Sequence, residues 1–311
     1  MPLFFFLSGL TAKEWTHGAG LRPLRGLKSL LVPYVFFSLI SIDCWAILKG
    51  YTSTSDTLTS QLWQMGYGVA GPKESMHYNI PLWFFTCLIS VRLLFAVLTA
   101  TVASNAVRCV CVVMTALIAH YFVFARFESM IWNFDVALVA LVFFFAGHAV
   151  QNLNLSAVRG NVASRVVVRV GALLLFVLAI KGNGRVDMNG RSFGNPLLFY
   201  VGAFAGITLM VEIAKKLDRI AAIKTLGRAS IVIFPVHALF WLLPSRFFSV
   251  ISWYATKVTD SEVFVSFVVS VMEIAACLFS YFVLTKWAPS LIGQKTRAQP
   301  RTLEKGASVS A

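Results

Sequence analysis

The sequence predicts an all-α fold, a bundle of helices that crosses a membrane several times. Of the 311 residues, 58% are hydrophobic and only 13% are charged, and the mean hydropathy is +0.76. Soluble domains are nearer half apolar and a quarter charged. The apolar residues also fall into runs of about 20, the length that a helix needs to cross the hydrocarbon core. Because backbone polar groups cannot be left without partners in lipid, each of these runs must be helical.

The chain in order gives nine apolar segments, of which the first is too short for a complete span. That segment covers residues 1–12 and breaks at Ser8-Gly9. The spans that follow are expected near 29–48, 81–99, 106–125, 131–150, 165–181, 194–213, 229–243 and 262–286. Within the span 229–243, Pro235 and Pro244 predict a kink and a stop. We therefore expect a membrane domain over 1–292, followed by a disordered basic tail over 293–311.

The Lys and Arg residues predict the orientation of the bundle, because cytoplasmic loops of membrane proteins are rich in them. If the basic loop 13–28 is cytoplasmic and the sides alternate, most Lys and Arg residues fall on the cytoplasmic side. The C-terminal tail is then cytoplasmic too. The net charge of +14 has the same explanation, so we expect the lipid bilayer and not nucleic acid as a partner.

Two long polar segments lie on the other side. Residues 49–80 are rich in Gly, Ser and Thr and end in His77-Tyr78-Asn79, whereas residues 182–193 read GNGRVDMNGRSF. Both segments are long enough to close over the mouth of a bundle, and both carry polar and aromatic side chains of the kind that bind sugars. Solvated loops without a binding function have the same composition, so both interpretations stay open.

Ionisable residues inside apolar spans are the most informative, because each costs roughly 2.5–3.5 kcal/mol to insert. Glu273 lies about 16 Å into the last span, near the midplane, and Arg92 is similarly deep in the span 81–99. The two either form a structural ion pair, or Arg92 belongs to a cationic site that opens inward. His237 is either a hydrogen-bonded core residue or a functional one. No metal-binding spacing, disulfide framework or soluble-enzyme motif is found.

Short motifs in a fixed order carry a family resemblance. MPLFFFLSG is followed by KSLLVPY, then by PLWF at 81–84, FFFAG at 143–147 and VDM at 186–188. FYVGAFAG follows at 199–206, a Gly-Arg-x-Ser element leads to His237, and APSLIG stands at 288–293. Each motif is weakly specific, but their order resembles the acyltransferase-3 family of integral membrane O-acyltransferases. The resemblance is strongest to its branch similar to fucose 4-O-acetylases.

The resemblance implies a ten-helix fold in a bacterial inner (cytoplasmic) membrane, and transfer of an acetyl group from acetyl-CoA to a sugar hydroxyl. The acceptor is then an extracytoplasmic or lipid-linked glycan, and no cofactor is bound. Supporting catalytic roles fall to His237, Ser230 and Asp187. Donor binding falls to Arg25, Lys28 and Arg92, where Arg25 and Lys28 stand in place of the family's Arg-x-x-Arg. Sugar contacts fall to Arg185, Asn189, His77 and Trp83, and Glu273 is a buried charge.

The sequence departs from the family at its beginning. The family's catalytic His lies in a first helix that precedes the motif MPLFFFLSG, and this sequence starts at the Met of that motif. We therefore expect one preceding helix to be missing and the 311 residues alone to be inactive. The alternative hypothesis is a non-catalytic transporter or scaffold for glycans.

Overall fold

The computed structural model describes residues 1–14, 26–48, 57–69, 76, 78–125, 127–151, 162–242 and 262–294. Over these residues the fold is all-α, and the single β-bridge joins Asp187 to Ser192. Eight helices within this part of the chain are long and apolar enough to cross a membrane. The prediction of a polytopic helix bundle is thereby confirmed.

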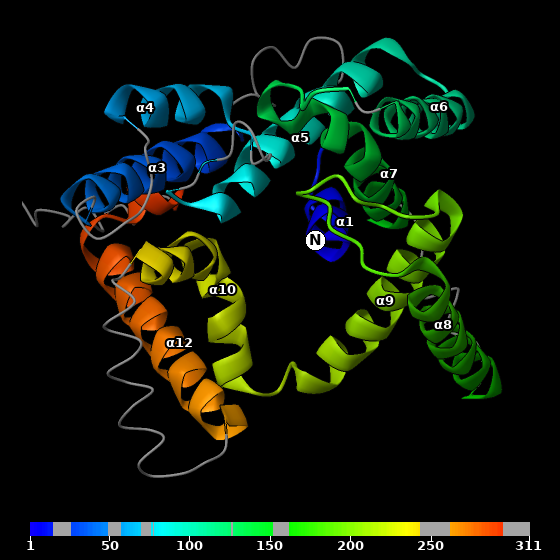
Figure 1. Ribbon diagram of the computed structural model, residues 1–311. Helices are drawn as coiled ribbons and strands as arrows, with labels where there is room; N and C mark the ends of the chain where they lie inside the picture. The colour runs from blue at the N-terminus through cyan, green and yellow to red at the C-terminus, as the bar shows by residue number, and fades with distance from the viewer. Residues whose placement is uncertain are drawn as a thin grey trace, which may run out of the picture.

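The helices begin and end close to the expected spans (Figure 1). The α-helices are α1 (Pro2–Leu10), α3 (Lys28–Leu48), α4 (Leu58–Tyr67), α5 (Trp83–Thr101), α6 (Asn105–Phe124), α7 (Phe134–Gln151), α8 (Val162–Asn183), α9 (Pro196–Leu217), α10 (Ala221–Val236) and α12 (Glu262–Trp287). The 3-10 helices are η2 (Ile80–Leu82), η3 (Ile131–Asn133), η4 (His237–Leu242) and η5 (Pro289–Ile292).

The helix expected at 229–243 begins eight residues earlier, so its predicted start is wrong. Residues 221–228 were assigned to a cytoplasmic loop because of Lys224 and Arg228, but both residues lie on the first two turns of α10. Lys224 forms an ion pair with Asp218 at 3.3 Å. Lys and Arg side chains are long enough to reach the polar interface from a helix segment that itself lies in the apolar layer. The predicted kink is confirmed, since α10 gives way to η4 one residue after Pro235.

Helix α4 was missed inside the segment 49–80, which was interpreted as a loop. Its first turn is capped by Thr57, whose side chain accepts a hydrogen bond from the N–H of Ser60 at 3.2 Å. Its C-terminal cap is Gly68 in the left-handed conformation, with φ of 67°. Gln61 and Gln64 are buried, whereas Trp63 is exposed. The helix therefore buries a polar face, and it lies beside α3 (Figure 1).

The core forms where α1, α5 and α7 meet, and α1 packs most closely against α7. Gly9 and Gly147 lie at this crossing: an added Cβ on either would stand 2.0 Å from a backbone oxygen of the other helix. Small residues let transmembrane helix backbones approach closely. Helices α8 and α12 are largely exposed and apolar, as lipid-facing helices are. Figure 1 shows them on opposite sides, α12 beside α10 and α8 beside α9.

Candidate functional site

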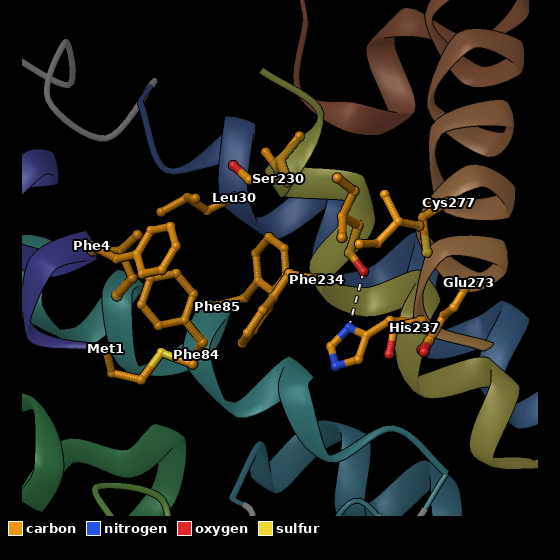
Figure 2. A pocket seen from close by; sticks show the side chains of 15 residues that line it. Met1, Phe4, Leu30, Phe84, Phe85, Ser230, Phe234, His237, Glu273 and Cys277 are labelled. Atoms are coloured by element: carbon orange, nitrogen blue, oxygen red, sulfur yellow. Dashed lines mark hydrogen bonds between the residues drawn. The ribbon is translucent and has the colours of Figure 1, made fainter. Parts of the chain in front are cut away.

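A pocket of about 550 Å³ lies between α1, α3, α5, α10 and α12 (Figure 2). Most of its lining is apolar and aromatic, including Phe4, Phe84 and Phe234. Its polar side chains are Ser230 on α10, His237 at the start of η4, and Ser270 and Glu273 on α12. A large apolar pocket with a few convergent polar groups is the usual form of a small-molecule site.

The imidazole of His237 is held in one tautomer by the helix that carries it. Its Nδ1 lies 3.0 Å from the carbonyl oxygen of Ile233, the contact drawn as a dashed line in Figure 2. A carbonyl oxygen only accepts hydrogen bonds, so Nδ1 carries the hydrogen and Nε2 keeps its lone pair. An imidazole held this way accepts a proton through Nε2, which is what a general base does.

Acceptors near the end of α10 lack some of their usual donors. Pro235 has no N–H, so the carbonyl of Ile231, a residue that lines the pocket, lacks the hydrogen bond that residue 235 would donate in an α-helix. The hydroxyl of Ser230 donates to the carbonyl of Gly227 at 2.8 Å, so its oxygen also stays available as an acceptor. The end of α10 therefore presents acceptors and no cation to the pocket.

Helix α12 contributes Ser270, Glu273 and Cys277, which are three or four residues apart and so share one face. Glu273 has no ion-pair partner among the residues that the structure describes. Its carboxylate therefore brings an uncompensated negative charge to the pocket that His237 lines.

The predicted ion pair between Arg92 and Glu273 is not formed. The guanidinium of Arg92 donates to the hydroxyl of Ser8 at 3.2 Å and to the carbonyl of Gly26 at 3.3 Å. It lines a second pocket, of about 240 Å³, that lies between α1, α5 and the start of α3. The reason is the packing of the bundle: α12 contacts α10 and η5, while α5 contacts α7 and α3.

This second pocket gathers positive charge. Lys13 lines it together with Arg92 and Gly26, and Lys28 begins α3 two residues after Gly26. Both partners of Arg92 among the described residues are neutral, so within this part of the chain its charge is uncompensated, which favours an anion. The structure thus brings Arg92 next to the turn that holds Lys28. Arg25, predicted with them, lies outside the described residues.

The residues predicted to contact a sugar are scattered. Trp83 is only 4% exposed and packs in the core at the first turn of α5; its contact with a sugar stays a prediction. Arg185 is exposed and Asn189 is half-buried on the loop between α8 and α9. His77 lies outside the described residues.

Asp187 holds the shape of that loop and does not line the pocket of His237. Its Oδ1 accepts hydrogen bonds from the backbone N–H groups of Asn189 at 3.0 Å and Gly190 at 3.1 Å. The carboxylate closes a tight turn in this structure, and its supporting role in catalysis stays a prediction. Of the three predicted catalytic residues, Ser230 and His237 share the pocket.

Arg191 was missed, although it makes the only ion pair of this loop among the described residues. Its Nη1 donates to Oδ2 of Asp135 at 3.0 Å, and the side chain of Asp135 is 2% exposed. Arg191 holds a left-handed backbone with φ of 54°. The signal was Asp135 itself, because a carboxylate in the first turn of an apolar helix needs a cation or hydrogen-bond donors.

The comparisons with known proteins give one match. The sequence over residues 1–287 matches the model of a protein family described as an acyltransferase domain. No curated protein and no solved structure matches the chain.

Proposed function

The chain belongs to the acyltransferase-3 family, and from this premise we propose that it transfers an acetyl group from acetyl-CoA to a sugar hydroxyl. The acceptor in this proposal is an extracytoplasmic or lipid-linked glycan. The protein would act in a bacterial inner membrane with its C-terminus in the cytoplasm. The observation that carries the proposal is the fixed imidazole of His237, with its free Nε2 at a pocket of about 550 Å³.

The resemblance gives His237 a supporting role only and predicts that the 311 residues alone are inactive; this proposal departs from both expectations and makes His237 the general base. In this mechanism Nε2 of His237 takes the proton of the sugar hydroxyl while that oxygen attacks the thioester carbonyl. The tetrahedral intermediate then collapses. The C–S bond breaks, an ester C–O bond has formed, and the proton passes from the imidazolium to the departing CoA sulfur. The carboxylate of Glu273 lies in the same pocket and favours the imidazolium while it exists. Ser230 supports the site as a hydrogen-bond acceptor.

The cationic pocket suits the other end of the donor. Acetyl-CoA carries several phosphate charges, and Arg92 and Lys13 present positive charge at this pocket with no carboxylate partner among the described residues. Lys28 begins α3 close by, and Arg25, outside the described residues, stays a proposed donor contact. Arg185 and Asn189 on the loop between α8 and α9 remain proposed contacts of the sugar, as does His77, which lies outside the described residues.

The test is acetyl transfer by the full chain in detergent or nanodiscs, followed as release of CoA thiol and as O-acetyl signals in the glycan NMR spectrum. We expect His237→Gln to lower the rate by about 10²–10⁴-fold, the usual contribution of a general base. The matched control is His120→Gln. His120 lies on α6, packs against the rings of Phe193 and Tyr200, and does not line the pocket. Identical O-acetylation of glycan from cells that carry or lack the gene would overturn the proposal.

A further inference from the structure

Asn79 is a buried polar residue that the mechanism above does not use. It precedes η2 and is 1% exposed. Its Nδ2 donates to the carbonyl of Pro235 at 2.9 Å and to the hydroxyl of Ser41 at 2.9 Å. One side chain therefore ties together three segments: α3, the entry to α5 and the end of α10.

The orientation of this amide is fixed by its partners. Ser41 donates its hydroxyl hydrogen to the carbonyl of Phe37, at 2.6 Å, so its oxygen must accept from Asn79. The carbonyl of Pro235 also only accepts. Both hydrogens of the amide are thus used, one on each partner. The amide nitrogen, and not the oxygen, faces α10.

The bond to Pro235 acts where α10 is weakest. Pro235 removes one hydrogen bond of the last turn, and the chain continues as the 3-10 helix η4 from His237 onward. The imidazole of His237 is itself held only through Ile233 in the same turn. The Asn79 amide therefore supplies a hydrogen bond from outside α10 to the backbone between Ile233 and His237, beside the ring contact of Phe84 with Phe234.

Stability alone is a poor explanation for Asn79. Its Oδ1 is buried and has no hydrogen-bond partner among the described residues. A buried acceptor without a partner costs about 1–3 kcal/mol, and an apolar residue of similar size would avoid that cost. What Asn supplies at this position is an amide that donates two hydrogen bonds in fixed directions, which an apolar residue cannot do.

We propose that Asn79 is a positioning residue that holds His237 at the pocket through the carbonyl of Pro235. This inference rests on the proposed function, in which His237 is the general base. It adds that the tautomer and place of the imidazole depend on a residue more than 150 positions away in the sequence, which does not itself line the pocket.

The test compares Asn79→Leu with the matched control Ser41→Ala in the full chain. Each variant removes a hydrogen bond of the same amide, but only the first releases Pro235. We expect the ring-nitrogen NMR signals of ¹⁵N-labelled His237 to show the Nδ1–H form in the wild type and in Ser41→Ala, and a mixture of both forms in Asn79→Leu. We also expect kcat to fall about 10–100-fold in Asn79→Leu, with KM for acetyl-CoA changed by less than about twofold.

A single Nδ1–H form in Asn79→Leu, or an equal loss of kcat in Ser41→Ala, would overturn the inference. If Asn79→Leu does not fold, Asn79→Ser serves in its place, because the shorter side chain cannot span to Pro235. The NMR readout needs no substrate. A wild-type protein that transfers no acetyl group would therefore refute the proposed function, while the tautomer would still decide the role of Asn79.

Discussion

Replacing Gly9 or Gly147 by Ala should separate α1 from α7. The added Cβ of residue 9 would lie 2.0 Å from the carbonyl oxygen of Phe144, and that of residue 147 would lie 2.0 Å from the carbonyl oxygen of Phe6. Ordinary contact begins at 3.4 Å, so the backbones must separate by about 1.4 Å. Overpacking of this kind costs about 1–3 kcal/mol or more, and the better helix propensity of Ala returns about 1 kcal/mol. Because a backbone separation of this size is large, we place the overpacking cost at about 3 kcal/mol, which leaves a net loss of about 2 kcal/mol for each variant.

The measurement is unfolding of the full chain in mixed micelles with increasing SDS. Gly171→Ala on α8 is the matched control, because nothing lies within 4 Å of an added Cβ there; we expect it to be as stable as the wild type or slightly more so. The double variant Gly9→Ala with Gly147→Ala should lose less than the two single losses together, since one separation relieves both clashes. Wild-type stability of both single variants would refute the close crossing.

Three further outcomes are expected. Arg92→Gln should raise KM for acetyl-CoA about tenfold while kcat stays within about twofold, because it removes a uniform contact to the donor; a change in kcat alone in steady-state kinetics would contradict this. Asp135→Asn should lower stability more than the double change with Arg191→Met, since the single variant leaves the arginine without its partner; equal melting losses would reject the pair. The hydrogen bond from His148 holds the pKa of Glu14 below its usual value. The ionised carboxylate of Glu14 therefore contributes stability that is present above about pH 4.5 and is lost as the pH falls below that. Glu14→Gln should flatten a profile of stability against pH measured between pH 7 and pH 3.5.

The sequence predicted the spanning helices well because lipid leaves few alternatives. A run of about 20 apolar residues must be a helix in a bilayer, and all eight expected spans are helical over most of their length. Helix α4 has only 10 residues and is too short to cross the membrane, so a search for apolar runs of about 20 residues does not predict it. Its signals were local: Thr57 as an N-cap and Gly68 as a C-cap. The start of α10 was missed for the related reason that Lys224 and Arg228 lower the hydropathy of its first turns.

The candidate site was harder to predict because its contacts join distant segments. Sequence gives the depth of Arg92 and Glu273 along their helices, but not which neighbours each helix has. Arg92 meets Ser8 and Gly26, 84 and 66 positions away, since α1 and the start of α3 pack beside α5. Asn79 carries no charge and interrupts no apolar run, so no pattern distinguishes it from other loop residues. Its role is visible only in the bond to a carbonyl 156 positions away.

The separation of Arg92 from Glu273 is itself an argument about function. Two opposite charges at similar depth in a bilayer would each be less costly if they paired, yet each lines a different pocket and has no ionised partner among the described residues. A charge kept apart in this way attracts a charged group that arrives during the reaction. Under the proposed function, Arg92 and Glu273 each attract a different charged group. Arg92 meets the anionic donor, which is present from binding to release, while Glu273 meets the imidazolium of His237, which exists only during transfer. Arg92 should therefore govern KM for the donor, and Glu273 should govern kcat.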